Sequence, residues 1–238
     1  MEKSSAAVLF VHGIQGQPKQ FRFLIDALPP EAEARAILLP GHGQTAREFE
    51  AVGRAEWLAA VRSETEALLA RGKRVVYVGH SMGCLLGLEV SRQLGHPYAG
   101  MLLLCCPFWP SFAARITEGI RSIGNKSAEE DPRVTASREG NSVRVEGFRD
   151  QLRLFPPYAD LLRLMGRARR MRPRAPERIR FFFAGRDEVV SAWSVSLARK
   201  WPRASVRVLE GCGHCYFPQP AARILQSSLN ELVTEASK

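Results

Sequence analysis

Short apolar runs rich in β-branched and aromatic residues alternate along this chain with stretches of helical spacing. This alternation strongly constrains the fold, because parallel neighbouring strands must be joined by crossover helices. It predicts an α/β fold with a mostly parallel sheet and helices on both faces. The expected strands, including the turns that end them, cover residues 7–13, 34–39, 75–78, 100–106, 180–187 and 205–209, and the expected helices cover residues 21–28, 54–70, 84–94, 158–171, 191–200 and 221–235.

The regular alternation stops at Pro107, which ends the fourth expected strand. Residues 122–141 are polar and contain glycine, and no clear strand follows until residue 180. We expect residues 107–157 to form an inserted lid or cap over the edge of the sheet. Because the sequence shows neither an internal repeat nor a linker, residues 1–238 are expected to form a single domain.

The overall composition is typical of a folded protein, with 45% hydrophobic and 24% charged residues. The start of the chain, MEKSSAAVLFVHG, is too acidic and its apolar part too short for a secretory signal, and no apolar run approaches the roughly 18 residues that span a bilayer. Five cysteines, an odd number, argue against a disulfide framework and favour a reducing compartment. A cytoplasmic location is therefore expected.

The net charge of +10 is concentrated in one part of the chain. Residues 107–180 contain 16 Lys and Arg against 9 Asp and Glu, so this segment, which includes the expected lid, is basic. A solvated, arginine-rich helical surface is one interpretation, and a weak association of the lid with anionic membranes is another. No nucleic-acid-binding motif accompanies the charge, so no nucleic-acid partner is expected.

Gly79-His-Ser-Met-Gly83 is a G-x-S-x-G motif. This motif is common by chance in a chain of this length, but here it lies between an expected strand and an expected helix. A nucleophile elbow needs this context, because its serine occupies a strained turn and the flanking glycines let the neighbouring backbone pass closely. The motif therefore predicts that Ser81 is a nucleophile at the N-terminus of a helix.

A serine nucleophile needs a base, and the base needs an acid that orients it. Of the five histidines, only His214 follows a late strand, whereas His12 and His42 lie in glycine turns where structural hydrogen bonds are expected. Asp187 ends the fifth expected strand, 27 residues before His214, and Glu188 is the weaker alternative for the acid. The resulting order Ser, Asp, His is the one that this architecture uses.

An oxyanion has to be stabilised by preorganised donors. The backbone N–H of Met82, the residue after the nucleophile, is one expected donor. The other is the backbone N–H of Ile14 in the loop HGIQG (residues 12–16), which follows the first strand. All these positions lie at the carboxyl ends of strands, where ligands bind in open parallel sheets.

The motifs HGIQG, PGHG, GHSMG, GRDEVV and GCGH occur together in this order. The chain thereby resembles the serine hydrolases of the α/β-hydrolase fold, particularly small bacterial carboxylesterases and monoacylglycerol-lipase-like enzymes. The resemblance covers nearly the whole chain. Two departures are visible: no room remains before Ala7 for the usual antiparallel strands, so a reduced sheet of about six strands is expected, and the insertion matches no known cap.

Cys212-Gly-His-Cys215 is also a C-x-x-C pair. A thioredoxin-like domain needs several elements after that pair, and only 23 residues follow Cys215, so a redox function is excluded. A zinc site is not expected either, because no second pair exists at ligand spacing. Oxidation of the two thiols could still displace His214 and inhibit the protein. Cys105 and Cys106, in an apolar run, are expected to be buried.

The sequence as a whole predicts a hydrolase that cleaves carboxylic esters, either short to medium acyl esters or monoacylglycerols, through an acyl-enzyme and without cofactor or metal. A thioesterase or another acyl hydrolase on the same triad is the alternative, and a binding protein that keeps the fold without catalysis is a more distant one. Phe108, Trp109 and Phe112 are candidates for the lining of an acyl channel under the lid.

Overall fold

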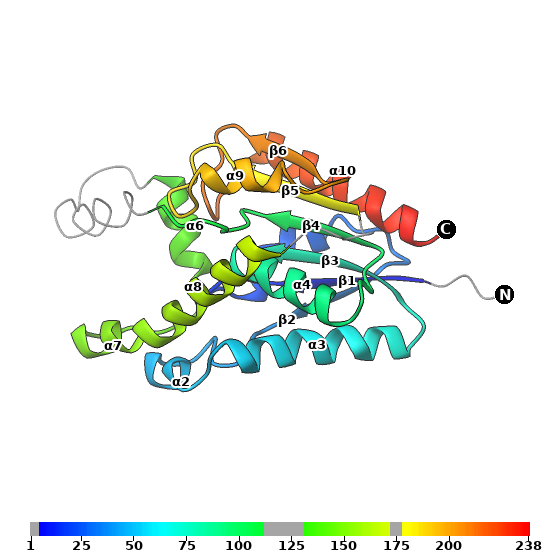
Figure 1. Cartoon of the computed structure of the whole chain (residues 1–238). Helices are drawn as coiled ribbons and strands as arrows, with labels where there is room; N and C mark the ends of the chain where they lie inside the picture. Colours follow the sequence, from blue (N-terminus) through cyan, green and yellow to red (C-terminus); the bar gives the residue numbers. More distant parts are fainter. Residues whose placement is uncertain (1–4, 112–130, 172–177) are drawn as a thin grey trace.

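A computed structural model of the chain describes residues 5–111, 131–171 and 178–238. Six strands form one sheet in the order β2-β1-β3-β4-β5-β6, and every neighbouring pair is parallel (Figure 1). The predicted α/β-hydrolase fold with a reduced sheet of about six strands is confirmed. The strands are β1 (Ala6–Val11), β2 (Glu33–Ile37), β3 (Arg74–His80), β4 (Gly100–Leu104), β5 (Arg178–Ala184) and β6 (Ser205–Leu209).

Helices cover both faces of the sheet (Figure 1). On one face α4 (Met82–Gln93) lies against β3, where the Tyr77 hydroxyl donates to the Gly83 carbonyl at 2.6 Å, and α3 (Arg54–Ala70) packs beside it. On the other face α10 (Gln219–Ala236) crosses β1, β3 and β4 and holds α1 (Arg22–Ile25) through side-chain amides that donate to backbone carbonyls. The remaining helices among the described residues are a 3-10 turn at Pro18–Phe21, α2 (Ala46–Glu50), α6 (Pro132–Gly140), α7 (Phe148–Arg153), α8 (Phe155–Arg170) and α9 (Trp193–Ala198).

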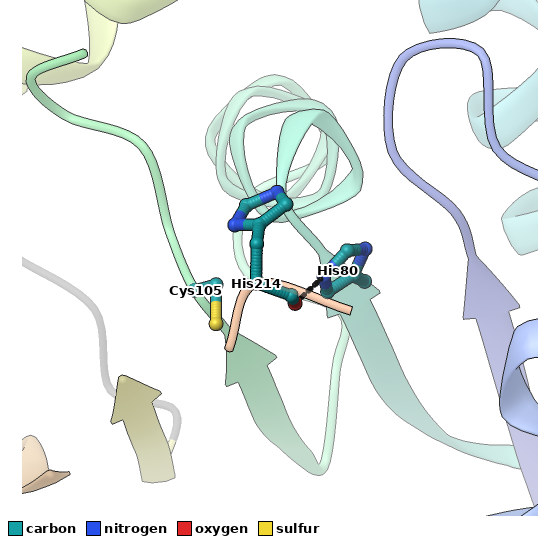
Figure 2. Close-up of side chains that lie close together, drawn as sticks. All are labelled: His80, Cys105 and His214. Carbon is teal, nitrogen blue, oxygen red and sulfur yellow. Dashed lines mark hydrogen bonds between the residues drawn. The ribbon is translucent and has the colours of Figure 1, made fainter. Parts of the chain in front are cut away.

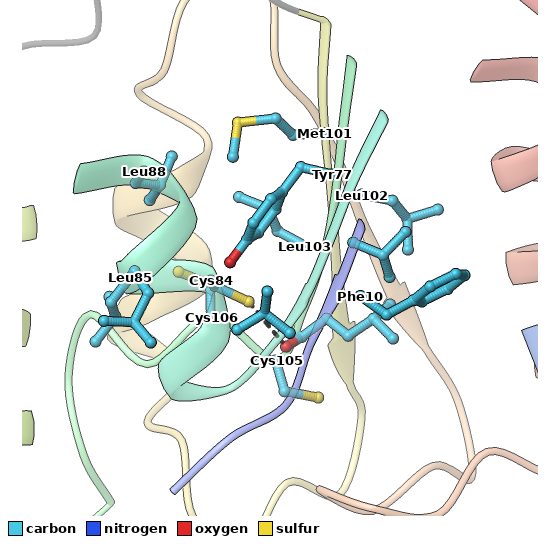
Figure 3. Close-up of a cluster of buried hydrophobic side chains, with 14 of the residues drawn as sticks. Phe10, Tyr77, Cys84, Leu85, Leu88, Met101, Leu102, Leu103, Cys105 and Cys106 are labelled. Atoms are coloured by element: carbon cyan, nitrogen blue, oxygen red, sulfur yellow. Dashed lines mark hydrogen bonds between the residues drawn. The ribbon is translucent and has the colours of Figure 1, made fainter. Parts of the chain in front are cut away.

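The core lies between the central strands and α4, as Figure 3 shows. All residues of β1 and β4 are buried, which explains why these strands read as continuous apolar runs rather than alternating ones. Cys105 and Cys106 are fully buried, as predicted. Strand β4 ends two residues earlier than expected because Cys105 has a φ of +51°, which a strand cannot accommodate.

The short helices α2, α6 and α7 were not predicted, although the first two carry capping signals in the sequence. Thr45 and Glu48 form a reciprocal capping box at the start of α2. The carboxylate of Asp131 accepts a hydrogen bond from the Arg133 amide at the start of α6, and Pro132 occupies the first helical position. Their few apolar residues left no helical pattern to recognise.

The described part of the expected lid, residues 107–111 and 131–157, contains α6, α7 and the first turn of α8. Helix α8 then continues to Arg170 and packs against α3 and α4. Asp160 accepts a hydrogen bond from the Arg54 amide at 3.0 Å, and Arg167 pairs with the buried Glu89 of α4. None of the helices in the described ranges has the length and hydropathy that a membrane crossing requires.

Candidate active site

Ser81 lies between β3 and α4 in a strained backbone conformation, with φ +51° and ψ −120°. Residues other than glycine rarely adopt positive φ, and the strain is characteristic of a nucleophile elbow. The turn is held by the Ser81 amide, which donates to the Leu104 carbonyl at 2.9 Å, and by the Ser81 carbonyl, which accepts from the Cys84 amide at 3.0 Å. The side chain is thereby raised above the edge of the sheet.

The glycines around Ser81 are required by close contacts. A Cβ on Gly83 would lie 2.0 Å from the Val11 carbonyl oxygen, and a Cβ on Gly79 would lie 2.8 Å from the Cys84 nitrogen. A Cβ on Gly13 would come within 2.9 Å of the Ser81 Cβ. The elbow and the loop after β1 are therefore packed backbone to backbone, as the motif predicted.

Asp187 and His214 meet at the carboxyl ends of β5 and β6. The His214 Nδ1 lies 3.1 Å from both carboxylate oxygens of Asp187. The same carboxylate accepts hydrogen bonds from the amides of Val189 and Val190, at 2.9 and 2.8 Å, in the turn that follows. Because Nδ1 bonds to the carboxylate, the imidazole presents Nε2 for a proton transfer.

The backbone of His214 is held from two sides. Glu188, the weaker alternative for the acid, accepts a hydrogen bond from the His214 amide at 3.1 Å and so supports the loop rather than the ring. His80 donates from Nε2 to the His214 carbonyl at 2.9 Å, and Figure 2 shows the two residues side by side. Sequence reasoning assigned no role to His80, since its position next to Ser81 gives no hint of this long-range contact.

The electrostatics of the site favour an ionised Asp187. Burial acts to raise its pKa, but the neighbouring His214 and the backbone amides outweigh it, so that the pKa lies below its ordinary value. Burial and the adjacent Asp187 raise the pKa of the Cys105 thiol, which therefore stays protonated against the carboxylate.

His80, Cys105 and His214 are the described residues whose ligand atoms lie close enough to suggest a metal, within 4.8 Å of one another (Figure 2). Two of these groups are already engaged: His214 Nδ1 bonds to Asp187, and His80 Nε2 bonds to the His214 carbonyl. A metal ligand would also need a deprotonated Cys105, whose thiol pKa is raised. The arrangement supports the histidine of a hydrolytic site better than a metal centre.

The two expected oxyanion donors lie on either side of Ser81. Met82 begins α4, and Ile14 follows β1 in the loop that packs on Ser81. Within the described residues, neither backbone N–H is used in a hydrogen bond. Both amides therefore remain for an oxygen bound at Ser81, with the N-terminus of α4 adding its partial positive charge.

His12 and His42 have structural hydrogen bonds, as their glycine turns suggested. The His12 Nε2 accepts from the Leu39 amide at 3.0 Å, and the His42 Nε2 accepts from the Gln15 amide at 3.1 Å. Burial lowers the pKa of His12 to about 3 and that of His42 to about 4. Both rings are therefore neutral at pH 7, which leaves each Nε2 able to accept.

A largely apolar cavity of about 770 Å³ opens above Ser81. Ser81, His214 and Ile14 lie on its floor, and the helices α7 and α8 supply most of its apolar wall. The apolar side chains from these helices and the segment between them are Leu152, Leu154, Phe155, Leu161, Leu162 and Met165. The spacing of Leu161 and Met165 on α8 was visible in the sequence, but their position over the serine was not.

Two of the expected substrate-lining residues, Phe108 and Trp109, lie elsewhere. Phe108 is fully buried in the core, packed against Phe181 and Trp201. Trp109 is partly exposed beneath the guanidinium of Arg169, 4.0 Å from its ring centroid. Neither is among the described residues that line the cavity, although Pro107, Pro110 and Ser111 of the same segment are. Phe112 lies outside the described residues.

The two cysteines that flank His214 are free thiols. Burial raises the pKa of Cys212 to about 11 and that of Cys215 to about 12. Since the thiolate is the form that oxidises, little of either cysteine is reactive at neutral pH, which argues against inhibition by oxidation.

A model of the alpha/beta hydrolase family matches residues 8–226 of this chain. Over 237 residues the chain is 26% identical to the dihydrolipoyllysine-residue acetyltransferase component of the acetoin cleaving system of Pseudomonas putida, and it spans 62% of that protein's length.

Similar solved structures include a soluble variant of monoglyceride lipase from Saccharomyces cerevisiae in complex with a substrate analogue. The TM-score between this lipase and the present chain is 0.76, and the two are 13% identical. The match covers 100% of the present chain and 89% of the lipase chain. A thioesterase from the prodiginine biosynthetic pathway of Streptomyces coelicolor has a TM-score of 0.64 and 20% identity over 96% of this chain and 91% of that chain. At identities this low, the structural similarity shows that the folds are shared and does not extend to function.

Proposed function

Because the chain belongs to the alpha/beta hydrolase family, we propose that it is a serine hydrolase that cleaves carboxylic esters, with Ser81, Asp187 and His214 as its catalytic triad. The observation that carries the proposal is the strained Ser81 on the floor of an apolar cavity that His214, hydrogen-bonded to Asp187, also lines. The proposed nucleophile, its proposed base and the apolar side chains that would hold the acyl group all line the same cavity.

In the proposed reaction His214 takes the proton of the Ser81 hydroxyl through Nε2 as the oxygen attacks the ester carbonyl. Asp187 stabilises the imidazolium that forms, since its carboxylate bonds to Nδ1. The amides of Ile14 and Met82 donate to the oxyanion. His214 then protonates the leaving alcohol, and water repeats the sequence on the acyl-enzyme to release the acid.

Hydrolysis of p-nitrophenyl esters with acyl chains of about two to sixteen carbons tests this proposal. The wild-type protein is expected to turn over these esters and to react with a fluorophosphonate probe at Ser81, whereas Ser81→Ala does neither. Ser91→Ala, which changes a serine at the far end of α4, is the matched control. Hydrolysis by Ser81→Ala at more than a hundredth of the wild-type rate would refute the assignment.

The alternatives from the sequence are tested in the same experiment. A thioesterase would use the same triad, and the thioesterase from Streptomyces coelicolor has a similar fold. An acyl thioester is therefore tested as a substrate beside monoacylglycerols. Faster turnover of the thioester by more than tenfold in kcat/KM would select that function. A binding protein without catalysis would not label with the probe at all.

We also propose that the lid delivers substrate from anionic lipid surfaces. Phe148 and Leu152 on α7 and Phe155 and Leu162 on α8 are exposed, three of them at the cavity wall. Exposed aromatics beside arginines are typical of helices that lie at a membrane interface. Sedimentation with phosphatidylserine vesicles, weakened by Phe148→Ser and by high salt but not by Trp193→Ser on the distant α9, would support this role. Equal binding to neutral vesicles would contradict it.

A cytoplasmic location completes the proposal. All five cysteines are free and four of them are buried, which favours a reducing compartment over an oxidising one. Fractionation of cells that express the protein, with a cytoplasmic marker enzyme as reference, tests this.

A further inference from the structure

The loop that carries the Ile14 amide contains a strained residue of its own. The Gly16 amide donates to the Gly13 carbonyl at 3.0 Å, which closes a four-residue turn with Ile14 and Gln15 at its centre. Gln15 has a φ of +57°, a conformation that turns usually reserve for glycine or asparagine at this position. Something must hold a glutamine there, because an isolated turn would not favour it.

Ser142, from the lid segment between α6 and α7, binds this turn at several points. The Ser142 amide donates to the Gln15 carbonyl at 2.7 Å, and its hydroxyl lies 2.6 Å from the Gly16 carbonyl oxygen and 3.1 Å from the Gln15 carbonyl oxygen. The same hydroxyl oxygen accepts from the Gly43 amide at 3.1 Å. Ser142, which is 127 residues from Gln15 in the sequence, therefore links the turn to the loop after β2.

Gln15 is also held at its side chain and at its amide. The Tyr158 hydroxyl, on α8, donates to the Gln15 Oε1 at 2.8 Å. The Gln15 amide donates to the neutral His42 ring at 3.1 Å. The amide, the carbonyl and the side-chain oxygen of Gln15 thus all have partners. Ser142 of the lid is the partner of the carbonyl oxygen, and Tyr158 of the adjoining α8 is the partner of the side-chain oxygen.

We propose that Ser142 and Tyr158 are positioning residues that hold the Ile14 amide in the geometry that binds the oxyanion. They act through Gln15 and touch no reacting atom. Loss of their contacts would let Gln15 relax from its positive φ and would change the turn in which Ile14 is the neighbouring residue. The lid thereby helps to build the oxyanion hole in addition to covering the cavity. This inference rests on the proposed ester hydrolysis at Ser81.

The test compares Ser142→Ala and Tyr158→Phe with two matched controls. Ser228→Ala removes a buried hydroxyl on α10 that bonds to Arg180, and Tyr98→Phe removes the phenol that meets the Thr65 hydroxyl. Tyr98 lies just before β4, at the edge of the sheet opposite the site. Ser142→Thr keeps a hydroxyl and serves as the conservative variant.

Three quantities are measured for each variant: kcat and KM for p-nitrophenyl butyrate, the affinity for a butyl trifluoromethyl ketone, and the melting temperature. The ketone forms a hemiketal with Ser81 and places an oxyanion in the hole. A role in positioning the donors predicts that kcat and ketone affinity fall together, about tenfold for Ser142→Ala and about fivefold for Tyr158→Phe. The larger effect is expected for Ser142→Ala because it removes the hydroxyl contacts to the turn and to the Gly43 amide, whereas Tyr158→Phe removes one hydrogen bond to Gln15. KM stays within about twofold, and Ser142→Thr recovers most of kcat.

The inference is overturned if kcat falls while ketone affinity is unchanged, or if Ser142→Ala and Tyr158→Phe behave as Ser228→Ala and Tyr98→Phe do. A wild-type protein that neither hydrolyses the ester nor binds the ketone would instead refute the proposed function, so the two failures are distinguishable.

Discussion

The nucleophile elbow and the helices α7 and α8 line the same cavity, yet they are built in opposite ways. In the elbow, every residue of α4 from Met82 to Ser91 is buried, and the backbone of Gly83 touches β1. Helix α7 has no buried residue, and Phe155 at the start of α8 is 76% exposed.

If Ser81 is the nucleophile, as proposed, this difference separates the place of the chemistry from the place of substrate recognition. The geometry around Ser81 is set by backbone contacts in the core, where a single extra carbon atom would clash. The apolar wall of the cavity is formed by α7 and α8, which lie at the surface. A few contacts hold α8 in place, such as the hydrogen bond from the Arg54 amide to Asp160 and the Arg167–Glu89 ion pair. Changes in the elbow should therefore be costly, and changes in the wall should be mild and selective.

The largest effect is expected for Asp187→Asn at the rim of the sheet. An amide cannot stabilise the imidazolium of His214 or hold its tautomer, so kcat for p-nitrophenyl butyrate should fall about 10⁴-fold. Glu188→Gln is the matched control, since its amide oxygen still accepts from the His214 amide and its effect should stay within about tenfold. An Asp187→Asn variant with a tenth of the wild-type rate would mean that the carboxylate is not the orienting acid.

A pair of glycine substitutions contrasts the two regions directly. Gly83→Ala would force a methyl group to within 2.0 Å of the Val11 carbonyl and should lower the free energy of unfolding by about 3 kcal/mol or more. Gly166→Ala, inside α8, meets only the flexible Arg169 at 3.8 Å and should raise it by about 0.5–1 kcal/mol. Urea unfolding of both variants checks this. Equal losses would show that α8 is packed as tightly as the elbow.

Acid should destabilise the loops around the site. Burial lowers the folded-state pKa of His12 and His80 to about 3 and of His42 to about 4, below their ordinary value of 6.5. The unfolded chain then binds more protons, so stability falls as the pH drops through 6.5 and continues to fall toward these values, by about 1.4 kcal/mol per pH unit for each histidine. Urea midpoints at pH 7, 6 and 5 measure the slope, and equal midpoints would contradict the neutral histidines.

The smallest effect is expected at the exposed wall. Phe155→Ser removes apolar surface from the cavity entrance and should lower kcat/KM for long acyl chains about three- to tenfold, with little change for acetate esters. Trp193→Ser on α9 is the control, because Trp193 is as exposed but does not line the cavity. An equal loss of kcat/KM for all acyl chain lengths would indicate that Phe155 contributes to stability and not to substrate recognition.

Much of the fold and the site could be predicted because the signals are local. Strand periodicity and crossover helices specified the parallel sheet, and the glycines at positions 79 and 83 marked a turn that only close backbone packing explains. The sequence also suggested Asp187 and His214, which the structure places 3.1 Å apart, from their positions at the ends of successive strands.

The cavity wall could not be predicted, because it depends on where a segment packs and not on its own periodicity. Phe108 and Trp109 were expected to line an acyl channel because they lie in the expected lid, yet Phe108 is buried in the core. Phe155 and Leu162 were unremarkable apolar residues until α8 was placed over Ser81.

By itself the sequence determined the succession of strands and helices along the chain, the tight glycine turn around Ser81 and the candidates for the active side chains, since each of these depends on a few neighbouring residues. Only the tertiary structure decided which distant groups support them: His80 beneath His214, and Ser142 and Tyr158 around Gln15. Such contacts join residues more than 120 positions apart, and nothing in a local pattern encodes the partner of a hydrogen bond formed across the folded molecule.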